Sequence, residues 1–286
     1  GVGPKRSDGS ARRGVYLWAP LFYALGLGAK EMAVTAILLV GLLDVLHPPR
    51  RLRWADRLLR LTPMLVVCVG YLWVRSLLLE PSSYSYFGDE GTAVIVNTML
   101  GVFGLYVRLL LVPWPLNPFY DWSAIPFETS LFAWNPLVGG GLLLLWLAAI
   151  VWAWRRRSPA AFWMSLFLVL LIPVSQIVPV VVAAGERFLY LALAGPLVAV
   201  SWAMTRPRFE SMRSVFVGVG FVVLLAWGGL TTVRNHDWQT DRRILEAYVA
   251  DWPESFNAWM GLAQLHEREM RWAEALTIYE KIGRDA

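Results

Sequence analysis

The feature that most constrains this chain is a series of apolar runs long enough to cross a lipid bilayer. Residues 137–154 are eighteen consecutive apolar or glycine residues, and residues 188–204 and 215–230 are similar. A helical crossing needs about 20 predominantly apolar residues, with a range of about 17–25. Hydrophobic residues make up 57% of the chain and charged residues only 16%, against about 25% charged residues in soluble domains. The sequence therefore predicts an all-α, polytopic membrane protein.

Basic residues gather in four short clusters between these runs, and they set the predicted orientation. The clusters are Lys5, Arg6, Arg12 and Arg13; Arg50, Arg51, Arg53, Arg57 and Arg60; Arg155–Arg157; and Arg206, Arg208 and Arg213. Cytoplasmic loops carry an excess of Lys and Arg, so we expect all four clusters in the cytoplasm. The net charge of +5 reflects these loops, and nucleic-acid binding is not expected.

An adjacent cation and anion, Lys30 and Glu31, interrupt the first apolar run at 15–46. Because basic clusters flank this run on both sides, it is expected to cross twice, with an extracytoplasmic turn near residues 28–31. One long tilted helix is the alternative. A charge at membrane depth costs about 2.5–3.5 kcal/mol on insertion scales, so the pair is a candidate functional site. The other interpretation is an ion pair that only locks the turn.

The run at 94–112 is apolar enough to cross, but the orientation argues against a crossing. Residues 137–154 must enter from outside to leave their basic cluster in the cytoplasm, so 94–112 is expected to lie in the outer interface or to re-enter from it. One helical face of this run holds Asn97, Gly101, Gly104 and Arg108. This face either lines a functional site or only permits close helix packing, with Arg108 extending toward water.

The remaining membrane segments follow from the same orientation. Residues 61–79 cross outward, and the proline- and aromatic-rich residues 113–136 form a shaped outer loop. Residues 160–204 form a second hairpin, whose outer turn carries Glu186 and Arg187. This second charge pair either belongs to a site or only caps a helix start, where Glu suits the positive end of the helix dipole. With a last crossing at 213–232, about seven crossings and one interfacial helix are predicted.

The C-terminal part, residues 233–286, has a different character from the membrane domain at 1–232. Counting from Trp259, Leu262 falls at +3, Ala275 at +16 and Tyr279 at +20, which fits the 34-residue tetratricopeptide consensus. Ala263 stands where that consensus has glycine, and His266 where it has an aromatic residue. We therefore expect the beginning of an extracytoplasmic tetratricopeptide domain.

The charged residues predicted on the outer side favour chemistry on a lipid-linked phosphate. Lys and Arg at the bilayer surface would neutralise the phosphate as it leaves, and a carboxylate would serve as general base for an incoming hydroxyl. The sequence contains no phosphate-binding loop of the G-x-x-x-x-G-K-[ST] type, no H-E-x-x-H and no metal-spaced Cys or His cluster. No metal and no cofactor is expected.

An ordered set of short motifs resembles one known family. The motifs are Ala29-Lys30-Glu31 with Thr35 and Asp44; Arg108 through Pro113 with Pro115-Leu116-Asn117; Glu186-Arg187-Phe188-Leu189-Tyr190-Leu191; and Arg234-Asn235-x-Asp237-Trp238. Together they resemble the transmembrane-and-tetratricopeptide-repeat protein O-mannosyltransferases and their bacterial relatives, which are polytopic glycosyltransferases of the GT-C class. One departure is that Ala192 and Leu193 stand where that family has Pro-Ser.

The resemblance implies transfer of a sugar from a polyprenyl-phosphate donor to a protein hydroxyl on the extracytoplasmic face, in a bacterial inner membrane. It also implies a catalytic acid in an outer loop that precedes Gly1, so the chain is expected to be the C-terminal part of the membrane domain plus the first repeats. The expected donor-binding residues are Lys30, Glu31, Arg108, Glu186, Arg187 and Tyr190. The repeats are expected to dock the acceptor protein.

Two other functions are compatible with the sequence. One is a non-enzymatic scaffold, in which the membrane part is an anchor and the helical repeats recruit partner proteins. The other is a transporter or a polysaccharide ligase with appended repeats, although the segments show no inverted repeat of the kind found in secondary transporters.

Overall fold

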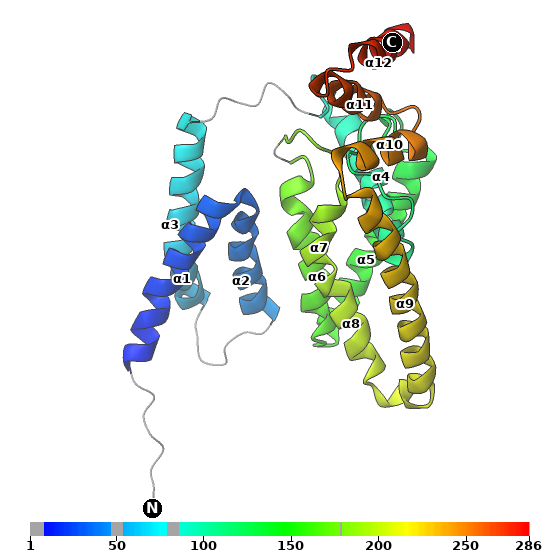
Figure 1. Ribbon diagram of the computed structural model, residues 1–286. Coiled ribbons are helices and arrows are strands. Elements are labelled where there is room, and N and C mark those ends of the chain that lie inside the picture. The colour runs from blue at the N-terminus through cyan, green and yellow to red at the C-terminus, as the bar shows by residue number, and fades with distance from the viewer. Residues whose placement is uncertain (1–8, 47–53, 79–85, 178, 286) are drawn as a thin grey trace, which may run out of the picture.

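Helices form every regular element in the part of the chain that the structure describes. The structure is a computed structural model and describes residues 9–46, 54–78, 86–177 and 179–285 (Figure 1). The all-α fold class predicted from the sequence is confirmed. Several predicted loop residues fall outside the described residues, namely Lys5, Arg6, Arg50, Arg51 and Arg53.

Four of the described helices are long and apolar enough to cross a membrane. They are Leu61–Leu78 within α3 (Trp54–Leu78), α4 (Thr92–Leu111), α5 (Trp134–Arg155), and η4 (Pro207–Met212) continuing into α9 (Arg213–Asp237). A fifth arises if the pair Glu186–Ala192 and Ala194–Met204, bent by 41°, counts as one broken span. These helices indicate a membrane protein, while the predicted seven crossings stay a prediction.

The N-terminal helices pack as a small bundle. The first helix, α1 (Gly9–Ala29), ends one residue before Lys30, and η1 (Glu31–Val34) leads into α2 (Thr35–Leu46). The chain therefore turns back near residues 28–31, as predicted, and Figure 1 shows α1 and α2 as neighbouring helices joined at this turn, beside α3. A small core of Tyr23, Leu27, Ile37, Met64 and Cys68 holds the three helices together.

The pair formed by α4 and α5 is unusually close, because glycines lie at the contact. A Cβ atom at Gly101 would lie 3.2 Å from Asn135 Cβ, and one at Gly139 would lie 1.8 Å from the Leu100 carbonyl oxygen. Gly104 likewise contacts Gly139. Since later positions on α4 meet later positions on α5, the two helices run in the same direction. Residues 112–133, which we call the aromatic loop, must therefore return along the pair.

A second helical hairpin supplies the largest core. It consists of α6 (Ala160–Leu171) with η2 (Ile172–Val174), followed by η3 (Glu186–Phe188), α7 (Leu189–Ala192) and α8 (Ala194–Met204). Buried side chains of this hairpin, including Phe167 and Leu170, pack with Val102 and Tyr106 of α4. In the turn before η3, the Gln176 amide nitrogen donates to the Val182 carbonyl at 2.9 Å, and the amide oxygen accepts from Val180 N–H. This packing fixes Glu186 and Arg187 relative to α4.

The C-terminal helices are α10 (Asp241–Asp251), α11 (Phe256–Arg268) and α12 (Trp272–Asp285). Ala263 is fully buried and Ala275 is nearly so, which lets α11 and α12 pack closely as a hairpin. Figure 1 shows these helices at one end of the molecule, beyond the end of α9. The proposed domain boundary after residue 232 falls inside α9.

Candidate functional site

A partly buried carboxylate lies where the aromatic loop meets the second hairpin. Glu186 Oε1 accepts hydrogen bonds from the Asn117 backbone N–H at 2.7 Å and from the Tyr120 hydroxyl at 3.2 Å. The positive charge of Arg234, near the end of α9, also acts on Glu186. We call these four residues the Glu186 cluster. Its members come from three segments that are distant in sequence, so the cluster exists only when these segments are packed together.

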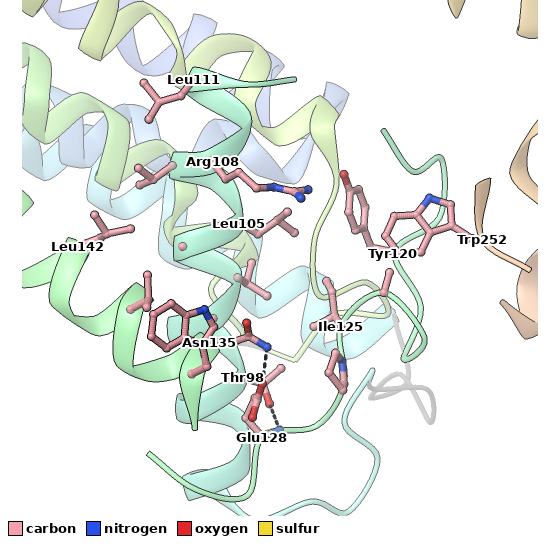
Figure 2. Close-up of a pocket in the computed structure, with 18 residues that line it drawn as sticks. Thr98, Leu105, Arg108, Leu111, Tyr120, Ile125, Glu128, Asn135, Leu142 and Trp252 are labelled. Carbon is pink, nitrogen blue, oxygen red and sulfur yellow. Dashed lines mark hydrogen bonds between the residues drawn. The ribbon is translucent and has the colours of Figure 1, made fainter. Parts of the chain in front are cut away.

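Arg108 stands beside this cluster, at the edge of a cavity of about 550 Å³. Figure 2 shows its guanidinium extending toward Tyr120, and its positive charge acts on the Tyr120 hydroxyl. The cavity walls come from α4, α5 and the aromatic loop, with Trp252 added from the end of α10. The Trp252 indole nitrogen is buried and finds no hydrogen-bond partner among the described residues. The site thus places an exposed cation beside the aromatic side chains of Tyr120 and Trp252.

Tyr120 is held as a neutral hydrogen-bond donor. Burial raises the pKa of Tyr120 above its ordinary value of 10.0, and the negative charge of Glu186 raises it further, whereas the charge of Arg108 lowers it. Tyr120 therefore keeps its proton near neutral pH and donates a hydrogen bond to Glu186. Arg108 stands beside the hydrogen-bonded Tyr120 and Glu186 and is the cation that an external anion in the cavity would meet.

The end of the cavity opposite Arg108 carries a carboxylate, an amide and a hydroxyl instead of a cation. The Glu128 backbone N–H donates to Thr98 Oγ1 at 2.9 Å, and the Asn135 side-chain amide donates to Glu128 Oε1 at 2.7 Å. Figure 2 shows these three residues together at the opposite end of the cavity from Arg108. Apolar residues line the wall between the two ends, among them Leu105, Ile125, Val138 and Leu142.

A buried network fastens the aromatic loop to the C-terminal helices. Asp121, only 2% exposed, accepts hydrogen bonds from Ser255 Oγ at 2.6 Å, from Asn257 N–H at 3.3 Å and from Ser123 N–H at 3.1 Å. The Tyr248 hydroxyl contacts both Ser255 Oγ and the Phe119 carbonyl. Burial raises the pKa of Tyr248 to about 12, so it also stays a neutral donor. The aromatic loop, which donates the hydrogen bonds to Glu186, is therefore positioned by α10 and α11.

The structure brings together only part of the predicted donor-binding set. Glu186 and Arg108 both act on the Tyr120 hydroxyl. Arg187 is exposed, with its guanidinium 5.1 Å from the ring centroid of Phe188, and its charge acts on Tyr106. The face of α4 predicted from Asn97, Gly101, Gly104 and Arg108 packs closely against α5 through its glycines, and Arg108 lines the cavity.

Two predicted residues are not among those that line the cavity or bond to Glu186. Tyr190 is 86% exposed and takes no part in the hydrogen bonds of the Glu186 cluster. Lys30 is exposed at the start of η1, and no hydrogen bond or ion pair among the described residues joins it to Arg108 or Glu186. The Glu31 side chain lies outside the described residues.

Four residues around Glu186 and Arg108 had no role in the sequence-based prediction, although two of them occur in its motifs. Asn117 follows Pro115-Leu116, and Arg234 begins the last motif. Tyr120 and Trp252 carry no sequence signal that separates them from the many other aromatic residues of this chain. No protein-family model matches the chain, and neither curated proteins nor solved structures show a significant similarity to it.

Proposed function

We propose that this chain belongs to a membrane glycosyltransferase of the GT-C class, similar to the protein O-mannosyltransferases with tetratricopeptide repeats. In this proposal the enzyme moves a sugar from a polyprenyl phosphate to a protein hydroxyl on the extracytoplasmic face, and this chain binds the phosphate of the donor. The observation that carries the proposal is Arg108 at the cavity edge, next to a neutral Tyr120 and a fixed Glu186.

The surroundings of Arg108 suit a phosphate attached to a lipid. A guanidinium presents several N–H donors in a planar fork that matches phosphate oxygens. Trp252 lines the same cavity with its aromatic ring, while its indole nitrogen is buried. Leu111 is 72% exposed and Val112 is 57% exposed at this end of α4, so an apolar chain attached to the phosphate would find apolar side chains there.

Glu186 is better suited to orient groups than to act as the catalytic base. Its Oε1 atom already accepts two hydrogen bonds, one of them from a backbone N–H that cannot move independently. A general base must be within hydrogen-bond reach of the proton it removes, whereas Glu186 is not among the residues that line the cavity beside Arg108. We assign it the role of holding Tyr120 and the aromatic loop in place beside Arg108.

In this proposal, the parallel packing of α4 and α5 favours re-entry of α4 from the outer side over a position in the outer interface. If α5 begins on the extracytoplasmic side, α4 begins there as well, and the aromatic loop brings the chain back to the same side. The Glu186 cluster and the C-terminal helices then share that side, because Asp121 joins the loop to α11. The proposal retains about seven crossings and identifies the hairpin of α11 and α12 as the first tetratricopeptide repeat, on the extracytoplasmic side with the acceptor protein.

Neutralising Arg108 tests the proposal. In the full-length protein reconstituted in proteoliposomes, Arg108→Ala should lower sugar transfer from a polyprenyl-phosphate sugar to an acceptor peptide by about 100-fold or more, the usual loss when one charge-stabilising group is removed. Arg243→Ala is the matched control, because Arg243 is exposed on α10 and is not a cavity residue. Normal transfer by Arg108→Ala would reject the phosphate assignment.

A second cavity favours the scaffold as the second candidate function. It measures about 430 Å³ and lies between the aromatic loop and the C-terminal helices, with Trp122, Phe256, Trp259 and Lys281 among its lining residues. Trp122 is 53% exposed, so an aromatic surface is open to a partner. A scaffold would keep partner binding in Arg108→Ala and would show no sugar transfer in the wild-type protein.

A further inference from the structure

The cavity beside Arg108 has a second polar end, and this end has the chemistry of a sugar site. Glu128 and Asn135 form a hydrogen bond that uses one carboxylate oxygen and one amide hydrogen. A carboxylate has two oxygens and a primary amide has a further N–H and a carbonyl, so both residues keep acceptors and donors for neighbouring hydroxyls. Trp134 lines the cavity next to Asn135 and is 76% exposed, which offers a flat apolar surface to a sugar ring.

The distance between the two ends suits a sugar joined to a phosphate. Thr98 and Arg108 are ten residues apart on α4, which corresponds to about 15 Å along the helix axis. A hexosyl phosphate with a hydrogen bond at each end covers most of this length. The wall between the ends is apolar, with Leu105, Val138 and Leu142, and would meet the non-polar face of a sugar ring rather than a second charge.

From this arrangement we propose that Glu128 and Asn135 form the subsite that recognises the sugar of the donor, while Arg108 holds its phosphate. The inference rests on the proposed function, because it assumes that a lipid phosphate binds at Arg108. The sugar then points into the cavity, and the lipid chain leaves past Leu111 and Val112. Thr98 contributes by fixing the Glu128 backbone through its hydroxyl.

This subsite makes a clear prediction about binding with and without the sugar. The full-length protein in nanodiscs is tested for binding of polyprenyl phosphate and of its mannosyl, glucosyl and galactosyl derivatives. Wild type should bind one of the sugar-bearing lipids about 10- to 100-fold more tightly than bare polyprenyl phosphate, as expected for hydrogen bonds to a charged group. Glu128→Ala and Asn135→Ala should reduce this preference to about twofold and leave affinity for the bare lipid unchanged.

Two further variants distinguish a failure of the sugar subsite from a failure of the proposed function. Arg108→Ala should weaken binding of the bare and the sugar-bearing lipids alike, and Glu274→Ala, at an exposed site on α12, should change neither. If wild type binds the bare lipid and Glu128→Ala keeps the full preference for the sugar, or weakens both ligands equally, the sugar subsite is wrong while the proposed function stands. The sugar subsite is also wrong if wild type shows no preference for any sugar-bearing lipid. If wild type binds no polyprenyl phosphate at all, the proposed function itself is rejected.

Discussion

Replacing Asp121 with alanine should lower the free energy of unfolding by about 2–4 kcal/mol and separate the aromatic loop from the C-terminal helices. The substitution leaves the backbone N–H groups of Ser123 and Asn257 without their acceptor and removes one of the two acceptors of the Ser255 hydroxyl. A buried donor left unsatisfied costs about 1–3 kcal/mol. Chemical unfolding in detergent micelles, followed by tryptophan fluorescence, measures the change. Sugar transfer should fall with it, because the same loop holds Tyr120 beside Arg108.

A double-mutant cycle shows whether this loss comes from the contact between the loop and α11. Ser255→Ala removes the other side of the hydrogen bond together with an N-cap to Ala258 N–H at 3.1 Å, which is worth about 1 kcal/mol. The double mutant should be more stable than the sum of the single losses predicts, by about 0.5–3 kcal/mol. Asp89→Ala, at an exposed position in another loop, should change little. Additive effects of Asp121→Ala and Ser255→Ala would contradict the assigned contact.

Replacing Glu186 with alanine should reduce sugar transfer about 100-fold or more and also destabilise the protein. The Asn117 N–H and the buried Tyr120 hydroxyl lose their acceptor, and Arg234 loses a nearby negative charge. The aromatic loop then shifts relative to Arg108, and misplacement of a positioning group by about 1 Å can cost about 100-fold in rate. The comparison of transfer rates with unfolding curves of the same samples distinguishes a local shift from loss of the fold.

The substitution Glu186→Gln distinguishes an orienting role of Glu186 from a role as the catalytic base. Glutamine keeps an oxygen that can accept from Asn117 N–H and the Tyr120 hydroxyl, so an orienting role predicts transfer within about tenfold of wild type. General-base catalysis contributes about 10²- to 10⁴-fold, so a base would not tolerate the change. Glu210→Gln, on the exposed η4 segment, is the matched control. Transfer by Glu186→Gln as low as that of Glu186→Ala would contradict the orienting role.

The parts of the fold that the sequence predicts are those set by local patterns. Apolar runs predict the helices, and the charged residues Lys30 and Glu31 break the first run, leaving α1 and α2 as two separate helices. The resemblance places Tyr190 in one set with Glu186, four residues earlier, but the two side chains lie in different surroundings. Four residues apart on a regular α-helix would share a face, but Glu186 begins a 3₁₀ turn, in which three residues complete a turn. Glu186 is therefore directed into the protein while Tyr190 is 86% exposed.

The contacts that build the site could not be predicted from local patterns. Asp121 and Ser255 are separated by 134 residues, so only the packed structure brings them together. The shortest bond to Glu186 comes from the backbone N–H of Asn117, and every residue except proline carries such a donor, so no side-chain pattern marks it. The resemblance to the O-mannosyltransferases placed Arg108 and Glu186 in one set, but it gave no role to Tyr120, Trp252 or Asp121.

The most direct test of lipid-phosphate binding is photo-crosslinking of the full-length protein with a polyprenyl phosphate that carries a diazirine close to its phosphate. Mass spectrometry of the labelled peptides should place the label on the C-terminal half of α4, around Arg108 and Leu111, and on the aromatic loop at Tyr120. Excess unlabelled polyprenyl phosphate and the substitution Arg108→Ala should both abolish this label. Labelling confined to α1–α3, or labelling of α4 that resists both excess lipid and Arg108→Ala, would contradict the proposal.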